Sequence, residues 1–171
     1  MSWTDKKSLE QILKLRDVHN ITMFLETGTF RGINAAVHAN NFETVVTCEI
    51  DAEYYWKSKI KLFEYTNVFV ALESSVSFLR RMRPIIESQS TFIYLDAHFY
   101  DATLPKLDRW VILKELAALK ELNCVIAIHD FDCGLGHLIY DGQPLNFDLV
   151  QESLYKVNPK FQYYVNTKKT C

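Results

Sequence analysis

The sequence predicts an α/β protein in which a three-layer, doubly wound and mostly parallel sheet carries helices on both faces. Five short β-rich runs recur about every 20 to 30 residues, and segments with helical spacing lie between them. Most of these runs are continuously apolar, which is typical of strands that are covered on both faces. Strands that alternate with helices form right-handed βαβ units, and these units build an open sheet.

The expected elements follow one another without a linker, a repeat or a low-complexity segment. The expected strands are residues 21–26, 44–49, 67–72, 91–96 and 124–130. The expected helices are residues 8–18, 52–63, 74–88 and 104–122, with a further helix after the glycines at 28 and 32. After Asp130 the pattern becomes a long loop (131–146), a helix (147–157) and a last strand (161–166). We therefore expect a single domain over residues 1–171.

The composition argues against a nucleic-acid or membrane partner. A formal charge of -2 argues against a broad surface for nucleic acid, so nucleic acid is not an expected partner. No uninterrupted apolar run approaches the ~20 residues of a membrane span, and the first residues lack a signal-peptide core, so no membrane partner is expected either. Cys48 and Cys124 lie in strand-like runs without zinc-type spacing. Reduced thiols and a cytoplasmic location are the simplest interpretation.

Acidic residues stand at or near the end of every predicted strand. They are Glu26, Glu49, Glu73, Asp96 and Asp130, and His98 and His129 lie beside the last two. A single acid after a strand is usually a helix N-cap or a turn former. Five in series along one edge indicate a ligand site, because ligands of open parallel sheets bind beyond the carboxyl ends of the strands. A crowd of carboxylates suits a ligand with positive charge and sugar hydroxyls.

The stretch "FLETGTFRG" indicates a tight turn after the first strand. Gly28 and Gly32 let the backbone approach a ligand closely, but Phe30 occupies the place of the middle glycine in the dinucleotide fingerprint. A nicotinamide-dependent oxidoreductase is therefore disfavoured. About 20 residues later, Glu49 ends the second strand, where an acid commonly holds ribose hydroxyls. The pattern describes a nucleoside-type ligand with a cationic tail.

These residues resemble the class I (Rossmann-like) S-adenosylmethionine-dependent methyltransferases. "LETGTFRG" is similar to the first motif of the family, "VVTCEID" to the second, and "NVFVALESS", "FIYLDAHF" and "VIAIHDF" to its third, fourth and fifth strands. The resemblance runs from about Ile21 to Asp130. It implies a Rossmann-like methyltransferase fold with S-adenosylmethionine as the cofactor.

Carried over by position, the resemblance also implies roles for individual residues. Gly28, Thr29, Phe30 and Gly32 would pass beneath the methionine part of the cofactor, and Glu26 would help to hold its amino group. Glu49 would bind the ribose hydroxyls, and Ile50 would pack on the adenine. Glu73 or Ser74 would face the amino edge of the adenine. Asp96 would lie beside the transferred methyl group.

The histidines point to the chemistry of the acceptor. "DAH" and "HD" resemble the small-molecule O-methyltransferases, in which acids after the fourth and fifth strands hold magnesium. Asp96 and Asp130 would then be Mg²⁺ ligands and His98 a candidate for the base. The candidate catalytic residues are His98, Asp96 and His129. Two carboxylates are a sparse ligand set for Mg²⁺. His129 also stands where those enzymes often place an oxygen donor, and a structural histidine is as good an interpretation of it as a functional one.

The end of the sequence departs from the family pattern. The family sheet finishes with an antiparallel strand pair, and only residues 161–166 resemble one of its strands, so we expect an incomplete pair. Either the chain is shortened, or a partner chain completes the edge, as a homodimer would. The leading hypothesis is methylation of a small molecule at oxygen, with residues 131–146 contacting the acceptor. The alternative is a non-catalytic domain that keeps the cofactor fold for binding or assembly.

Overall fold

A computed structural model describes residues 6–97, 103, 109–132, 139–140 and 142–164 of the chain. Its helices are α1 (Lys6–Val18), α2 (Ile33–Ala39), α3 (Ala52–Lys61), α4 (Ser75–Ser88), α5 (Val111–Ala118) and α6 (Phe147–Val157). Its strands are β1 (Met23–Thr27), β2 (Thr44–Glu49), β3 (Val68–Leu72), β4 (Thr91–Leu95), β5 (Val125–Ile128), β6 (Ile139–Tyr140) and β7 (Gln143–Pro144). The α/β fold expected from the sequence is confirmed.

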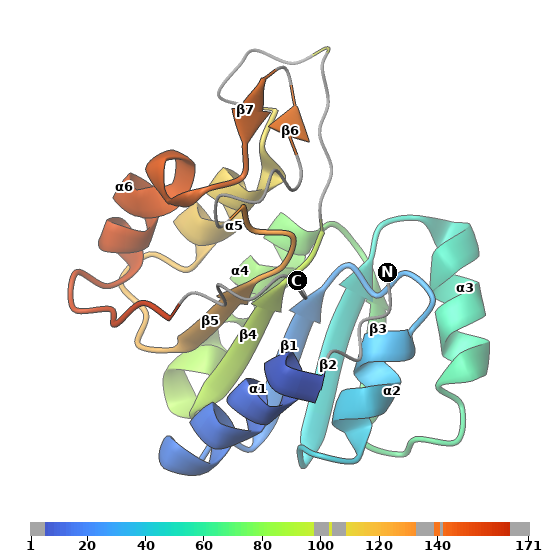
Figure 1. Ribbon diagram of the computed structural model, residues 1–171. Helices are drawn as coiled ribbons and strands as arrows, with labels where there is room; N and C mark the ends of the chain where they lie inside the picture. Colours follow the sequence, from blue (N-terminus) through green and yellow to red (C-terminus); the bar gives the residue numbers. More distant parts are fainter. Residues whose placement is uncertain (1–5, 98–102, 104–108, 133–138, 141, 165–171) are drawn as a thin grey trace.

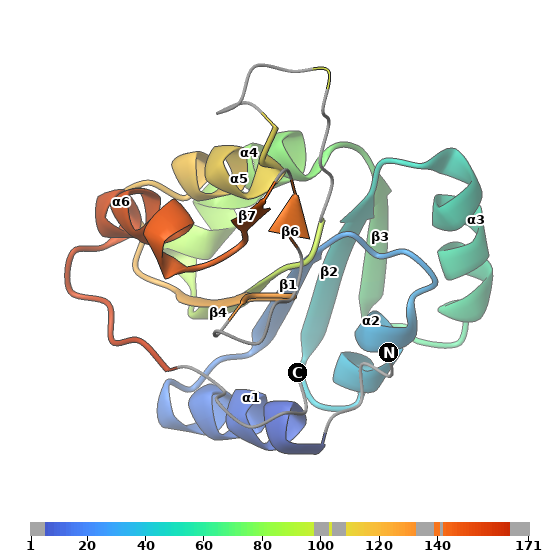
Figure 2. The same ribbon diagram turned by 45° about the horizontal axis from the view of Figure 1, so that its top comes forward.

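The main sheet has five parallel strands in the order β3-β2-β1-β4-β5. The order reverses at β1, so the β1 and β4 ends lie at the point where ligands bind in open α/β sheets. Helices α1, α2 and α3 cover one face and α4, α5 and α6 the other, as Figures 1 and 2 show. Three layers therefore surround two hydrophobic cores.

Each core occupies one face of the sheet because neighbouring residues of a strand point to opposite faces. Leu25 and Ile93 belong to the core under α4, α5 and α6. Phe24 and Phe92 belong to the core under α1 and α2, where their rings stack at 5.7 Å. The strands are continuously apolar because alternate residues are buried in the two cores on opposite faces of the sheet.

Polar side chains fix where several helices begin. Asp51 accepts hydrogen bonds from the N–H groups of Glu53 and Tyr54 at the start of α3, and Asn146 accepts one from Leu149 N–H at the start of α6. Both caps follow a strand or an extended segment directly. They fix where the chain turns from the sheet edge into a helix.

Three expectations about the second half of the chain were wrong. The expected helix 104–122 begins only at Val111 and ends at Ala118, while residues 104–108 lie outside the described residues. Residues 119–122 leave the helix, and Glu121 adopts a φ of 63°. The apolar residues there still pack into the core: Leu119 and Leu122 are buried. Burial, rather than helical continuation, explains the long apolar pattern.

The expected last strand is also absent from its described part, residues 161–164. The aromatic residues that indicated a strand pack on α6 instead: the Tyr163 ring lies 5.0 Å from that of Phe147. Residues 131–146 were expected to be a loop, yet β6 and β7 form a short antiparallel hairpin there. The Asp141-Gly142 pair in the sequence favours such a turn, and Gly142 has a φ of 73°.

None of the helices in the described part of the chain is long and apolar enough to span a membrane.

Candidate functional site

The sheet order brings the acids at the strand ends to one edge. From β3 to β5 these acids are Glu73, Glu49, Glu26, Asp96 and Asp130. Parallel strands end on the same side, so the convergence expected from the sequence follows directly from the topology. Glu26 lies inside β1 and is 1% exposed, and Glu49, the last residue of β2, is 8% exposed. The other three acids are partly exposed.

The turn between β1 and α2 has an unusual backbone that the glycines permit. Gly28, Phe30 and Gly32 have positive φ angles of 82°, 48° and 70°. The N–H groups of Gly28 and Thr29 both donate to the Cys48 carbonyl, at 3.0 and 2.9 Å. These bonds fold the turn over the end of β2.

Gly28 is needed for a reason that the sequence did not reveal. A Cβ atom there would lie 2.8 Å from the carbonyl oxygen of Asp96 and 3.1 Å from Ala97. The close approach is therefore made to the backbone after β4. The hydroxyl of Thr27 joins the same two strands, because it accepts hydrogen bonds from the N–H groups of Asp96 (3.1 Å) and Ala97 (3.3 Å).

Glu49 faces this turn and is held by backbone N–H groups. Its Oε2 accepts from Phe30 N–H at 2.8 Å, and its Oε1 accepts from the N–H groups of Ile50 (2.9 Å) and Asp51 (3.0 Å). The glycine turn and the acid at the end of β2 therefore lie together. Two predicted contact residues flank them at the surface: Ile50 is 73% exposed, and Phe30 is 47% exposed with its ring 4.4 Å from that of Tyr54.

Beneath the turn, Glu26 is the end of a buried hydrogen-bond network. Its Oε1 accepts from the Asn34 amide at 2.7 Å, and its Oε2 accepts from the Thr47 hydroxyl at 2.8 Å. The hydroxyls of Thr47 and Thr29 are 2.7 Å apart. Burial raises the pKa of Glu26 to about 8, and the nearby charges of Asp96 and Glu49 add to this, although the two hydrogen bonds oppose it.

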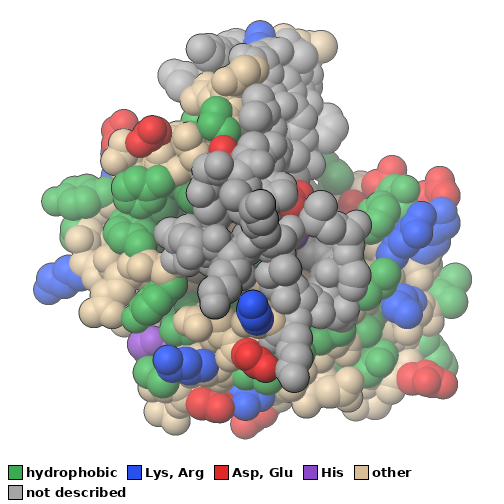
Figure 3. Space-filling model, viewed as in Figure 1, with side chains coloured by type: hydrophobic (Ala, Val, Ile, Leu, Met, Phe, Trp, Pro, Cys, Tyr) green, Lys and Arg blue, Asp and Glu red, His purple; other side chains and the backbone are tan. Residues whose placement is uncertain are grey.

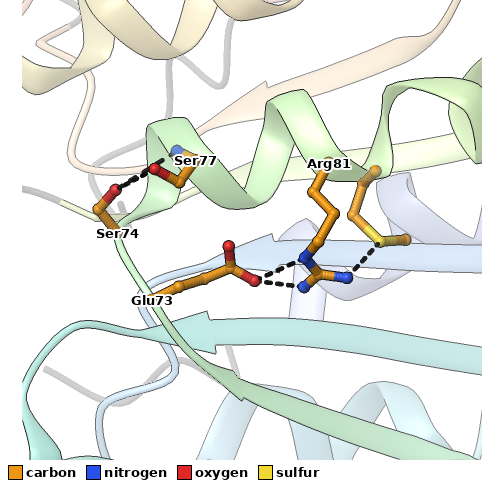
Figure 4. Close-up of polar contacts among 5 residues, drawn as sticks. Glu73, Ser74, Ser77 and Arg81 are labelled. Carbon is orange, nitrogen blue, oxygen red and sulfur yellow. Dashed lines mark hydrogen bonds and ion pairs between the residues drawn. The ribbon is translucent and has the colours of Figure 1, made fainter.

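Glu73 and Ser74, at the end of β3, are both engaged within the chain. Figure 4 shows the carboxylate of Glu73 paired with the guanidinium of Arg81, whose Nε donates at 2.9 Å. Ser74 is the N-cap of α4 and accepts from Ser77 N–H at 3.3 Å. Their predicted contact with an adenine stays a prediction. A ligand here would meet an ion pair and a helix start.

A second group of polar residues joins β4 to β5. His129 Nδ1 lies 3.1 Å from Oδ1 of Asp96 and 3.1 Å from Oδ1 of Asp130. Burial raises the pKa of Asp96 to about 6 against the opposing effect of His129. For His129 itself, burial lowers the pKa, but the hydrogen bonds and charges of Asp130 and Asp96 outweigh it and raise the pKa overall. His98 lies outside the described residues.

The described residues do not fit a magnesium site. Among the described residues, no group of three or more His, Cys, Asp or Glu side chains is arranged so that it could hold a metal ion. The imidazole nitrogen of His129 contacts both carboxylates that were expected to bind the ion. Mg²⁺ requires a near-octahedral shell of oxygen ligands, so we propose no step that involves a metal.

Sequence reasoning missed Thr27, Thr47, Asn34 and Glu115. The threonines lie inside apolar strands, where a Thr is an ordinary β-former and carries no functional signal. Glu115 is 1% exposed on α5, and burial raises its pKa to about 7, although hydrogen bonds with Ser75 and Thr27 oppose the shift. A charged residue within a strongly apolar helix is the signal that could have found it.

No protein-family model and no curated protein matches the sequence. Solved structures do match the fold. One is a protein from Galdieria sulphuraria that is described as a sarcosine dimethylglycine methyltransferase, with a TM-score of 0.59 over 88% of this chain at 15% identity. This chain has the fold of the class I methyltransferases.

Spermidine synthase from Thermotoga maritima also matches, with a TM-score of 0.51 over 82% of this chain at 18% identity. The chain spans 59% of the Galdieria protein and 45% of the Thermotoga protein. At these identities the likeness extends to the fold, and activity has to be argued from the site.

Proposed function

We propose that the chain binds S-adenosylmethionine and transfers its methyl group to an oxygen atom of a small molecule. The observation that carries the proposal is the hydrogen bond between Phe30 N–H and Glu49 Oε2, at 2.8 Å. It joins the glycine turn after β1 to the acid that ends β2, at the strand ends where ligands of this fold class bind.

The residues at this edge suit the chemistry of that cofactor. Glu49 uses three acceptor directions on backbone N–H groups, and a carboxylate has about four, so it can still accept from a ribose hydroxyl. Ile50 offers an exposed apolar side chain beside it. The buried carboxylates Glu26 and Asp96 favour a ligand that carries positive charge, because ionising either carboxylate alone is costly.

The cofactor would supply an electrophilic methyl group on a sulfonium, and the residues of the chain would orient the acceptor. His129, oriented through Nδ1 by Asp96 and Asp130, is the proposed general base. The proton of an acceptor hydroxyl would move to Nε2 of His129. The acceptor oxygen would bond to the methyl carbon as the carbon–sulfur bond breaks, so charge is conserved.

A small acceptor is favoured over nucleic acid because the formal charge of the chain is -2. Residues 131–146, expected to contact the acceptor, follow Asp130 directly and include β6 and β7. Their contact with an acceptor remains part of the proposal.

The cofactor assignment is tested by thermal unfolding with S-adenosylmethionine and with its demethylated product. At about 100 times Kd, binding adds about 2.7 kcal/mol, which is roughly a 5–10 °C rise in Tm for a chain of this size. Glu49→Gln should lose most of this rise, whereas Glu64→Gln, an exposed control after α3, should keep it. If neither compound raises the Tm of the unmodified chain, the proposal is wrong and a non-catalytic domain is favoured. A rise with NAD or NADP alone would favour an oxidoreductase.

The catalytic assignment is tested separately by release of the demethylated product in the presence of a panel of small hydroxyl compounds. His129→Ala should reduce turnover by about 10²-fold or more and leave the cofactor-induced Tm rise intact. His19→Ala, on an exposed residue after α1, is the control. Unchanged turnover in His129→Ala would remove His129 from the mechanism.

A further inference from the structure

Strand β3 forms an edge of the main sheet that no other strand covers in the described part of the chain. It is the last strand in the sheet order and pairs only with β2 in the described part of the chain. Its sequence, VFVAL, contains no charge, no proline and no glycine. Natural proteins usually protect an exposed edge with such residues, because unpaired backbone groups invite another strand.

The register shows which backbone groups point outward. Val45 N–H donates to the Asn67 carbonyl, and Glu73 N–H donates to the Glu49 carbonyl, at 2.9 and 3.0 Å. Alternate residues of β3 therefore face β2. The residues between them, Val70 and Leu72, direct their N–H and C=O groups away from the sheet.

Apolar side chains flank this edge. Phe69 in β3 is 57% exposed and lies on the face of the sheet that α4 covers. On the other face, α3 packs on β3 and exposes Trp56 (61%) and Ile60 (77%), and Phe63 (87%) follows shortly after the helix ends. We call these four residues the β3 edge surface. In Figure 3 hydrophobic side chains reach the surface among charged ones on the right-hand side, where Figure 1 places α3. Trp56 and Ile60 are four positions apart on α3 and lie on the same side of the helix, and Phe63 follows in the turn after it.

We propose that the β3 edge surface binds a second copy of the chain, with the two β3 strands paired antiparallel about a twofold axis. A twofold axis brings the same edge together from both copies, so the free backbone groups on each side meet their counterparts. Pairing of this uncharged strand with itself sets no like charges opposite one another.

Charge at the ends of α3 complements this arrangement. The helix has Asp51 and Glu53 at its start and Lys59 and Lys61 in its last turn. The twofold axis that makes the strands antiparallel also makes the two α3 helices antiparallel. The acidic start of each helix then lies toward the basic end of the other, and the helix dipoles oppose each other favourably.

The size of the surface predicts a reversible dimer. A large side chain contributes on the order of 150–250 Å² when fully buried, so four side chains exposed by more than half offer roughly 500 Å² per copy. Two copies would bury about 1,000 Å², near the lower limit for a specific interface. The dimer should therefore dissociate on dilution.

Sedimentation velocity over a wide concentration range tests the proposal. The unmodified chain should show a concentration-dependent dimer, and Phe63→Glu and Phe69→Lys should each weaken it at least tenfold. Tyr155→Glu on α6, 65% exposed before substitution, is the matched control and should dimerise like the unmodified chain. A monomer at every concentration, or dimerisation unaffected by both edge variants, would overturn the proposal.

Hydrogen exchange tests strand pairing directly. The Val70 and Leu72 amides should be protected in the concentrated unmodified chain and should exchange faster in Phe63→Glu. The Phe69 and Ala71 amides point toward β2, so they should stay protected in both and report that the variant is folded. Equal exchange of Val70 and Leu72 in the dimer and in the variant would rule out a paired β3 edge. None of these measurements depends on the cofactor.

Discussion

Phe30 donates its backbone N–H to Oε2 of Glu49 across nineteen positions of the sequence, at 2.8 Å. Oε1 of the same carboxylate accepts from the N–H groups of Ile50 and Asp51. One side chain thus holds the turn after β1 and the chain reversal after β2. Glu49 has a structural task as well as its proposed contact with the cofactor.

Glu49→Ala should therefore lower stability even without a ligand. The substitution leaves three partly buried N–H groups without their acceptor, which costs about 1–3 kcal/mol and roughly 2–10 °C in Tm. Glu64→Ala, which removes an exposed carboxylate, should leave Tm nearly unchanged. Denaturant unfolding of both variants measures the difference, and equal stability would show that the turn does not need the carboxylate.

Gly28→Ala should destabilise the chain more than Gly142→Ala. Both glycines have positive φ angles, 82° and 73°, so an alanine at either position would be strained by the left-handed backbone conformation. Only at Gly28 would the new Cβ meet backbone, 2.8 Å from the Asp96 carbonyl, whereas no atom lies within 4 Å at Gly142. We expect an additional loss of about 1–3 kcal/mol at Gly28 by denaturant unfolding. A similar loss at both sites would mean that the backbone segments after β1 and β4 can move apart at little cost in free energy.

The raised pKa of Glu26, about 8, predicts that stability falls as pH rises. Between about pH 4.5 and 8 the folded chain keeps a proton on Glu26 that the unfolded chain has lost. Raising the pH therefore favours unfolding, by up to about 1.4 kcal/mol per pH unit. Unfolding from pH 6.5 to 8 should show a smaller slope for Glu26→Gln than for the unmodified chain. If the free energy of unfolding changes with pH equally in both proteins, the pKa of Glu26 is not raised by folding.

The buried side chain of His38 is expected to lower the stability of the folded chain as the pH falls. Its ring is 2% exposed and stacks on Phe24 at 4.0 Å, and burial lowers its pKa to about 4. Between about pH 6.5 and 4, His38 binds a proton in the unfolded chain but stays neutral in the folded chain. The free energy of unfolding therefore falls as the pH falls through this window. His38→Phe should remove that loss relative to the unmodified chain. The exposed control His19→Phe should retain it. Calorimetry from pH 7 to 4.5 makes the comparison.

Much of the main sheet could be predicted because its strands are short continuous apolar runs between helices. This pattern predicts parallel strands, and parallel strands place Glu49, Asp96 and Asp130 at one edge without any further information. The second half was predicted less well. Residues 161–164 are as aromatic as a strand, and only packing on α6 distinguishes them from one. Likewise, the apolar pattern of residues 119–122 is the same for a helix and for a buried turn, so the sequence does not distinguish the two.

The sequence alone thus determined the α/β class, the five main strands and the alignment of acids at their ends, because these depend on local periodicity and chain direction. Tertiary structure alone decided how those acids are used: Glu26 is buried under hydrogen bonds, Glu73 pairs with Arg81, and His129 contacts two carboxylates. Distances across strands, and exclusion of water from a side chain, arise only when distant segments pack. The exposed β3 edge has the same origin, since a strand becomes an edge only through its place in the sheet.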